Sequence, residues 1–380
     1  SLFAVGFLSA QTWTWDREPE AGQNVNIQID GVPVDEGPLH VVYYYLDGTK
    51  LMCADAGQLP AERSSQIKVA IALHDHISWI YVTVKDEYNQ IGSSDQKFVK
   101  NPQALPNAGI VEHAVAASIY GRMIAMEVND ADVLADFRKA TQANAFWLES
   151  PDVLRGYFIT AKKTSSTEDL DVLKKYMTSL TTQSTGSSEE LLVQACRISK
   201  DMGDSTLNVS LRKKLDKKYP KSLLAQEDML NSFTKATTVE EKIKIRDKFR
   251  ANYPVTKDNT SLNDQMTSTL VQEASGKSDW TKAKSYIDQI IDPMLRARVC
   301  NSYAWTLSGE SIDAPAPNLD VAATLSAASL SALSVDNPLP TGITKKEWAQ
   351  VMENSKAMYG DTYALILFKQ GKYDEALSYQ

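Results

Sequence analysis

The sequence lacks the motifs that most catalytic centres require. Its three cysteines, Cys53, Cys196 and Cys300, are widely separated, and no Cys-x-x-Cys pair occurs. Thioredoxin-type redox chemistry needs such a pair, because one thiolate attacks and the neighbouring thiol resolves the mixed disulfide. Gly-x-Ser-x-Gly, a glycine-rich phosphate loop and a dinucleotide-binding fingerprint are also missing. The sequence therefore predicts no catalytic and no cofactor-binding residues, and it leaves open whether the chain is part of an enzyme.

The chain also lacks a basic excess and any long apolar run. Its 40 Lys and Arg residues against 48 Asp and Glu residues give a formal net charge of -8. A nucleic-acid-binding surface requires a basic excess. Basic runs do occur, as in 212–218, but this one includes Asp216 at helical spacing, so we interpret it as a solvated helix face. No stretch approaches the ~18 apolar residues that cross a bilayer. We expect neither nucleic-acid binding nor membrane insertion of the mature chain.

Residues 1–10 form an uncharged apolar run that ends in small residues and is followed by polar Gln11. Such a run is too short to span a membrane and is typical of the end of a signal peptide with its cleavage site. The alternative is a buried first strand. We interpret 1–10 as the remnant of a signal peptide and expect a periplasmic or otherwise exported protein of the cell envelope.

His74-Asp75-His76 is the one cluster in the sequence that resembles a metal site. Two histidines at a spacing of two would share one face of a strand. The alternative is a polar loop between two strands, which the apolar runs on either side already require. Only two further histidines occur, His40 and His113. We therefore predict a loop here and assign no metal ligand.

Residues 11–100 show the period of two that is typical of β-strands. Val25, Ile27 and Ile29 alternate with polar residues, and Asp47-Gly48 has the sequence of a tight hairpin turn. Several short strands at regular spacing, with no helix between them, predict an antiparallel, immunoglobulin-like β-sandwich.

Aromatic residues of this segment allow two interpretations. Trp13 and Trp15, extended by Tyr43-Tyr44-Tyr45, could form a sugar-stacking platform. Packing of the tryptophans into the sandwich core is the interpretation that we prefer, because aromatic residues are favoured in strands.

The pattern changes after residue 100. Pro102, Pro106 and Gly109 interrupt any regular period, so we predict a linker over 101–128. From 129 to 380 the apolar period is about 3.6, which predicts an unbroken succession of helices. Three capping boxes are expected at helix starts: Ser166-x-x-Asp169, Ser187-x-x-Glu190 and Thr238-x-x-Glu241.

Two features indicate tetratricopeptide-like repeats within 129–380. Tyr219-Pro220 and Tyr253-Pro254 lie 34 residues apart, which is the tetratricopeptide period. The segment 363–377 matches the turn of such a repeat, where Gly371 allows the backbone to turn, Tyr373 fills the gap and Ala376 lets the helices approach closely. The segment 276–283 repeats this scheme, beginning with Gly276 and continuing through Trp280 to Ala283. The fold class we predict is therefore α+β multidomain: an N-terminal antiparallel β-sandwich followed by an α-helical, tetratricopeptide-like solenoid.

Segments from residue 300 to the end carry a family resemblance. They are Ala304-Trp305, the run 318–322, Thr344-Lys345-Lys346-Glu347-Trp348, Met358-Tyr359-Gly360-Asp361-Thr362-Tyr363-Ala364 and the run 369–376. This pattern resembles the helical region of exported thioredoxin-like thiol–disulfide reductases of the Bacteroidetes type. The resemblance implies a β-sandwich first, a tetratricopeptide-like region next and a thioredoxin fold with a Trp-Cys-x-x-Cys site at the end. None of the family's redox residues has a counterpart in this chain.

Two functional hypotheses follow from these observations. In the first, the chain is the non-catalytic front of an envelope thiol–disulfide oxidoreductase, which holds a partner or positions a thioredoxin-like domain. Because the helix around Gln380 has no cap, this hypothesis expects 129–380 to be truncated and a redox domain to follow. In the second, the chain is a free-standing periplasmic scaffold that binds peptides or proteins and has no redox role. A carbohydrate-binding accessory protein is a weaker third alternative. Both leading hypotheses predict a protein or peptide partner on the helical region.

Overall fold

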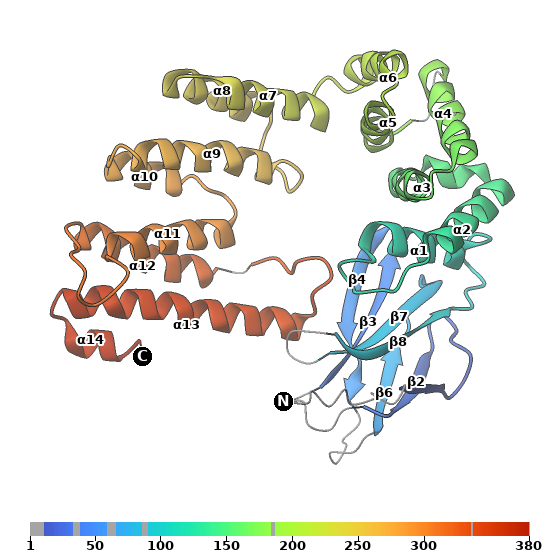
Figure 1. The fold of residues 1–380 in the computed structure, drawn as a ribbon, viewed down its shortest axis with the longest axis horizontal. Helices are drawn as coiled ribbons and strands as arrows, with labels where there is room; N and C mark the ends of the chain where they lie inside the picture. The colour runs from blue at the N-terminus through green and yellow to red at the C-terminus, as the bar shows by residue number, and fades with distance from the viewer. Residues whose placement is uncertain are drawn as a thin grey trace, which may run out of the picture. The chain divides into compact units, whose positions relative to one another are not determined.

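A computed structural model describes residues 11–32, 39–58, 66–85, 90–183, 187–335 and 337–379. The predicted signal-peptide remnant, 1–10, lies outside the described residues. The chain divides into two compact units: unit 1 is Ser1–Leu215 with Leu339–Trp348, and unit 2 is Asp216–Pro338 with Ala349–Gln380. Strands come first in the chain and helices follow (Figure 1). Of the helices described, none is both long enough and apolar enough to span a bilayer.

The N-terminal part of unit 1 consists of two four-stranded antiparallel sheets. One sheet has the strand order β1-β2-β6-β5 and the other has the order β4-β3-β7-β8. The strands are β1 Thr12–Trp15, β2 Asn24–Asp30, β3 His40–Asp47, β4 Lys50–Asp55, β5 Gly57–Gln58, β6 Gln66–Ala72, β7 Trp79–Lys85 and β8 Gln90–Phe98.

One apolar core receives side chains from both sheets. In the first sheet, Ile27 on β2 lies opposite Val69 on β6, and both are buried. In the second sheet, Val82 on β7 lies opposite Tyr43 on β3, and both belong to the same core. The alternation that predicted strands is therefore confirmed, because every second residue points into this core. The hairpin predicted at Asp47-Gly48 is also present between β3 and β4, where Asp47 pairs with Lys50.

Strands β3 and β7 are buried along nearly their whole length, because their second face is covered as well. On that face Trp79 stacks on Tyr81, with ring centroids 6.3 Å apart, and His113 lies 6.1 Å from Trp79. His113 belongs to α1 Ala108–Val115. Helix α1 thus covers the second sheet.

The segment 101–128, predicted as a linker, contains α1 and the π-helical turn η1 Ala116–Tyr120. Pro102 and Pro106 precede this helix and therefore do not interrupt it. The Glu112 carboxylate accepts a hydrogen bond of 3.0 Å from the Ser78 backbone N–H and so ties α1 to the start of β7. Gly109 permits the close approach, since a Cβ there would lie 2.4 Å from the Ser78 carbonyl oxygen. The glycine that suggested a break is needed for packing.

The remaining helices of unit 1 follow with short joints. They are α2 Asp130–Ala143, the 3₁₀ turn η2 Ala145–Glu149, α3 Pro151–Lys163, α4 Thr167–Thr182, α5 Glu189–Asp201 and α6 Ser205–Lys218, whose last turn belongs to unit 2. Ser166 caps α4 as predicted. The box predicted at Ser187 is wrong by one position, because Ser188 caps α5 and accepts the Leu191 N–H at 3.1 Å. Ser187 and Ser188 are equally able to cap, and the phase of the helix decides between them.

The helices of unit 2 are arranged as successive antiparallel pairs (Figure 1). They are α7 Leu223–Lys235, α8 Val239–Asn252, α9 Thr260–Ser275, α10 Trp280–Ile287, α11 Pro293–Leu307, α12 Leu319–Leu333, α13 Lys345–Lys369, which starts in unit 1, and α14 Tyr373–Leu377. Thr238 caps α8 with the complete predicted box. The two Tyr-Pro pairs, at 219 and 253, directly follow the ends of α6 and α8, as the repeat period predicted.

Four turns between helices share one backbone geometry. Each contains a residue at positive φ, between 54° and 77°. The N–H of that residue bonds to the carbonyl three positions earlier, and the next N–H bonds to the carbonyl five positions before it, which is the Schellman arrangement. The residues at positive φ are Ser165, Gly203, Ser278 and Gly371. Gly276, which we expected to act like Gly371, instead has a helical φ of -61°, and Ser278 takes that role.

A segment from late in the chain, Leu339–Trp348, belongs to unit 1. Glu347 forms an ion pair of 3.0 Å with Lys85 on β7, and both side chains are about one-fifth exposed, at 21% and 19%. Thr344 caps α13 and exchanges hydrogen bonds with Glu347 in a capping box. Burial alone would raise the pKa of Glu347, but the Thr344 N–H and the Lys85 ammonium outweigh burial and lower it. The return of the chain to β7 is therefore fixed by a charged contact.

A buried carboxylate joins the first helices of unit 1. Asp169, only 2% exposed, accepts hydrogen bonds from Arg138 Nη2 at 2.6 Å and from the Tyr157 hydroxyl at 2.6 Å. Ser166 also donates to it. Burial would raise the pKa of Asp169, but these donors outweigh burial and lower it to about 2. The ionised carboxylate therefore holds α2, α3 and α4 together.

We expect Asp169→Asn to lower the stability of the α2–α4 region by roughly 2 kcal/mol at pH 7. Because the folded-state pKa is depressed, this stabilisation exists above the unfolded pKa of about 3.9 and is lost as pH falls toward 2. Hydrogen exchange of peptides from 130–182 should show the difference at pH 7 and a much smaller one near pH 2. Asp171→Asn, at an exposed position on the same helix, is the control and should change neither. An Asp169→Asn effect that does not depend on pH would contradict the assignment.

Candidate functional site

The histidine cluster lies in a loop, as predicted. His74 and His76 fall between β6 and β7, where their rings stack with centroids 5.7 Å apart, and Tyr45 lies 5.4 Å from His74. Within the described ranges, no group of three or more His, Cys, Asp or Glu residues could hold a metal ion. The cluster therefore consists of stacked aromatic rings at one end of the first sheet.

The three cysteines lie in three different elements: Cys53 on β4, Cys196 on α5 and Cys300 on α11. Cys196 and Cys300 are buried, as expected for apolar packing. Burial raises the pKa of Cys53 to about 12 and that of Cys300 to about 11. Because a reactive thiol needs a lowered pKa, these two positions disfavour thiolate chemistry.

The aromatic residues that suggested a sugar platform belong largely to the core. Trp13 and Trp15 are partly buried and pack against the shared core of the two sheets, which is the interpretation that we preferred. Tyr43, Tyr44 and Tyr45 are each at most 7% exposed. They present no open stacking face.

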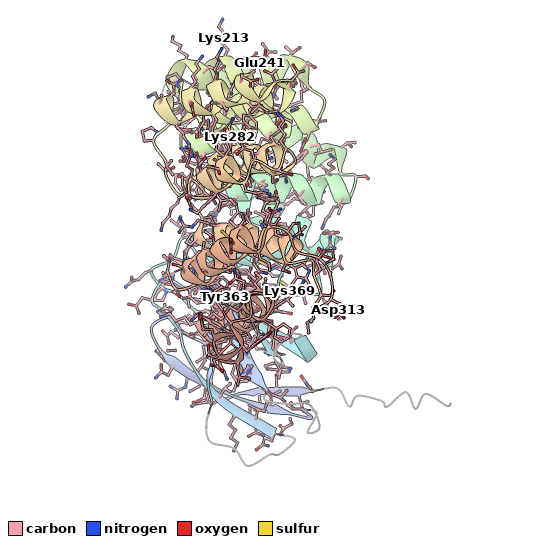
Figure 2. All side chains as sticks on the ribbon, turned by 90° about the vertical axis from the view of Figure 1, so that its left-hand side faces the viewer. Lys213, Glu241, Lys282, Asp313, Tyr363 and Lys369 are labelled. Atoms are coloured by element: carbon pink, nitrogen blue, oxygen red, sulfur yellow. The ribbon has the colours of Figure 1, made fainter. Side chains whose placement is uncertain are left out.

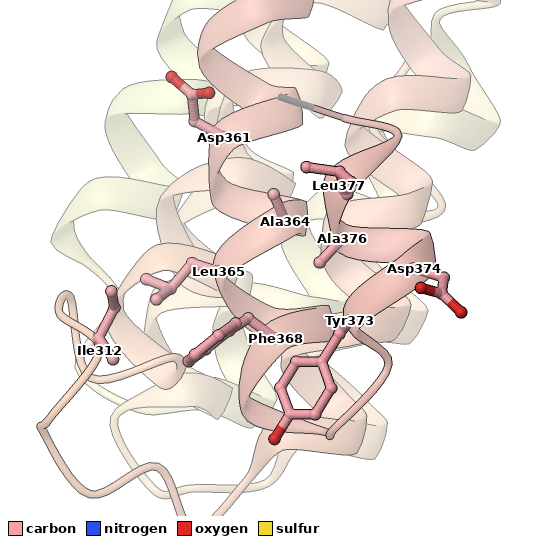
Figure 3. A pocket seen from close by; sticks show the side chains of 9 residues that line it. All are labelled: Ile312, Asp361, Ala364, Leu365, Phe368, Tyr373, Asp374, Ala376 and Leu377. Atoms are coloured by element: carbon pink, nitrogen blue, oxygen red, sulfur yellow. The ribbon is translucent and has the colours of Figure 1, made fainter.

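A hollow of unit 2 lies between α13, α14 and the loop after α11, and we call it the α13–α14 pocket (Figure 3). Its volume is about 590 Å³. Its lining residues are Ile312, Asp361, Ala364, Leu365, Phe368, Tyr373, Asp374, Ala376 and Leu377.

The floor and walls of this pocket are apolar. Buried Ala364 and Ala376 lie between the two helices and form the floor. Around them, Leu377 is 75% exposed, Ile312 61% and Phe368 43%. Large apolar side chains are therefore gathered at the surface here, a feature that is also found at interaction sites.

Tyr373 differs from its predicted role. We expected its ring to fill the gap between helices, yet it is 62% exposed and meets the edge of Phe368, with ring centroids 5.3 Å apart. The gap between the helices is instead filled by the small buried side chains of Ala364 and Ala376. A packed aromatic at this position would need a further helix against it.

The rim of the pocket is acidic. Asp361 and Asp374 are its only charged lining residues among those described, and both are exposed. Neither carboxylate has a hydrogen-bond or ion-pair partner in the described part of the chain. Figure 3 shows them on opposite sides of the apolar surface. The pocket therefore combines an apolar surface with two available negative charges.

One wall of the pocket is held in place by Lys369. Its ammonium group donates hydrogen bonds of 2.5 Å to the Ser308 carbonyl and 2.7 Å to the Ala314 carbonyl. These two carbonyls lie on either side of Ile312 in the sequence, so Lys369 fixes the loop that carries Ile312. Figure 2 labels Lys369 together with Asp313 of this loop. The pocket is thus partly preorganised.

Sequence reasoning recognised 363–377 as a helix turn but not as part of a pocket. Phe368 and Leu377 are apolar in the sequence, but their exposure is visible only in the structure. The contribution of Ile312, which lies far away in sequence, could not be seen without the fold.

No family model, no curated protein and no solved structure matches this chain.

We expect treatment with a chelator to leave the melting temperature of the protein unchanged. If His74 and His76 held a structural metal ion, its removal would lower the melting temperature by several degrees or more, because such sites contribute folding energy directly. Thermal unfolding followed by circular dichroism, with and without chelator, measures this. A fall that is restored by added zinc would contradict the stacked-loop interpretation.

We expect Lys369→Met to loosen the wall of the α13–α14 pocket. Loss of two hydrogen bonds from a charged donor should speed amide exchange in 309–314 by roughly tenfold or more. Lys372→Met is the matched control, because Lys372 is exposed in the same turn. Equal exchange rates in the two variants would show that the loop does not depend on Lys369.

Proposed function

We propose that this chain is the non-catalytic binding portion of a cell-envelope thiol–disulfide oxidoreductase. In this proposal the two sheets form an immunoglobulin-like sandwich and the helix pairs form a tetratricopeptide-like solenoid. The helical region holds a partner protein or positions a thioredoxin-like domain. The resemblance over residues 300–380 supports the redox context, and the apolar run at 1–10 supports export.

The observation that carries the binding role is the exposed apolar surface of α13 and α14 in the described part of the chain. The α13–α14 pocket exposes large apolar residues beside two carboxylates that lack partners among the described residues. A surface of this kind suits a protein or peptide better than a small polar substrate. Helix pairs commonly present such surfaces to extended or helical partners.

A free-standing scaffold without a redox role is the second candidate. The raised pKa values of Cys53 and Cys300 favour it, because they leave these thiols unsuited to exchange. The pocket would serve this candidate equally well.

The coding sequence beyond Gln380 discriminates between the two candidates. The redox proposal expects about 130 to 150 further residues, the size of one domain. They should contain a strand followed by Trp-Cys-x-x-Cys at the start of a helix, where the helix N-terminus lowers the pKa of the attacking thiol. A stop codon soon after Gln380, or further helix pairs alone, would exclude the redox proposal and leave the scaffold.

A further inference from the structure

A second hollow of unit 2 lies between α9 and α11, and we call it the α9–α11 hollow. Its volume is about 250 Å³, enough for one large side chain. Both of its walls are helices in the interior of the helical succession, since α7 and α8 precede them and α12 and α13 follow them. The hollow is therefore a feature of complete, packed helix pairs.

The α9 wall combines polar and apolar groups on one helix face. Ser268, Val271 and Gln272 line the hollow at positions i, i+3 and i+4, so they are neighbours on the helix surface. The Ser268 hydroxyl oxygen is buried and has no hydrogen-bond partner among the described residues. A buried hydroxyl without a partner is unfavourable, and a polar atom of a ligand in the hollow would satisfy it.

The α11 wall carries a positive charge. Arg298 and Ser302 form one row at i and i+4, and Val299 and Tyr303 form the row beside it. Arg298 is exposed and has no ion-pair partner in the part of the chain that the structure describes. Its guanidinium group is therefore available to a ligand.

The carboxylates of α9 and α11 are engaged elsewhere. Helix α11 contains no acidic residue, and α9 contains two, Asp264 and Glu273. Asp264 is buried and accepts the Ile291 N–H at 3.0 Å. Glu273 is bound by Lys242 of α8 at 2.6 Å. The charge that the two helices leave open at the hollow is thus the positive charge of Arg298.

The apolar end of the hollow is fixed in place. The Tyr303 hydroxyl oxygen accepts a hydrogen bond of 3.1 Å from Ser275. The Tyr303 ring meets the Trp280 ring edge to face, with centroids 5.7 Å apart. Beside this ring, Val271 is buried and Val299 is partly buried. An apolar surface next to a guanidinium group is therefore preorganised, which lowers the cost of binding.

We propose that the α9–α11 hollow binds an acidic side chain of a partner peptide, with Arg298 as its counter-ion. A guanidinium group presents parallel N–H donors that match a carboxylate. The methylene groups of a glutamate would lie on Val299 and the Tyr303 ring, as the stems of charged side chains commonly do. This inference rests on the proposed binding function of the helical region, and it adds the chemistry of one partner residue.

The borders of the hollow favour a side chain over a chain end. All of its lining residues belong to α9 and α11, and among the described residues no connecting loop closes either end. Both helices continue beyond the hollow in each direction, to Thr260 and Ser275 on α9 and to Pro293 and Leu307 on α11. An extended peptide can therefore pass across the hollow and place one side chain in it.

The test uses the whole chain and two labelled peptides that are blocked at both ends. One has a glutamate between leucines at its centre, and the other has a glutamine in its place. Fluorescence anisotropy should show saturable binding of the glutamate peptide, roughly tenfold tighter than that of the glutamine peptide. The difference should shrink at high ionic strength, because the guanidinium group is exposed.

Substitution of the counter-ion should remove this preference. The Arg298→Gln variant is expected to bind the two peptides with about the same affinity, because the charge that distinguishes them is gone. Arg296→Gln is the matched control, since Arg296 lies on the same helix and does not line the hollow. It should retain the preference of the native chain.

A second variant tests the location without changing a charge. Ser302→Phe places a large ring in the hollow and should weaken binding of the glutamate peptide by roughly tenfold, because it excludes the side chain. The fold should persist, since Ser302 is exposed, and its melting temperature checks this. Ser285→Phe, at an exposed position of α10 outside the hollow, should bind like the native chain.

Three results would overturn the inference. They are equal affinity of the native chain for the two peptides, a preference for glutamate that survives Arg298→Gln, and tighter binding of a glutamine peptide with a free C-terminal carboxylate, which would assign the hollow to a chain end. Saturable but equal binding of both blocked peptides would leave the proposed binding function standing. The coding sequence beyond Gln380 tests the redox proposal separately.

Discussion

Four of the described helix pairs depend on one backbone constraint, the left-handed residue that ends the first helix of the pair. At Ser165, Gly203, Ser278 and Gly371 this conformation directs the chain back and closes the last carbonyls of the helix with Schellman hydrogen bonds. A serine in this conformation costs on the order of 1 kcal/mol more than glycine. Serine occupies this position in two of the four turns despite its higher free energy there. Packing therefore helps to set the direction of the second helix, together with the turn residue.

Much of the fold could be predicted from the sequence, because the apolar period reports directly on burial. Val25, Ile27 and Ile29 on β2 are all buried, as their alternation required, and Leu207, Leu211 and Leu215 at helical spacing on α6 are buried as well. The errors arose where several residues could do the same work. Ser187 and Ser188 can both cap a helix. We expected Gly276 rather than Ser278 to be the left-handed turn residue, because glycine adopts that conformation most easily. In 101–128 we predicted a linker because of two prolines, but helix α1 starts just after them.

The candidate site was less predictable, for a different reason. Sequence patterns show which residues seek burial, but they do not show whether another element covers them. Trp280 and Tyr373 occupy equivalent turn positions, yet the ring of Trp280 is partly buried against Tyr303 and the ring of Tyr373 is 62% exposed. Ile312 lines the pocket from a loop whose two sides are bound by Lys369 through the Ser308 and Ala314 carbonyls. Both facts are tertiary, and no local pattern contains them.

The composition of the α13–α14 pocket bears on the proposed binding role. A surface that only faces solvent would carry polar residues, whereas this one carries Leu365 and Phe368 together with Asp361 and Asp374. In that role the apolar residues would supply contact area, and the carboxylates would disfavour partners that carry acidic groups at the same places. Leucine and phenylalanine alone would bind many apolar segments. With two carboxylates beside them that lack partners among the described residues, the pocket would discriminate by charge as well as by shape.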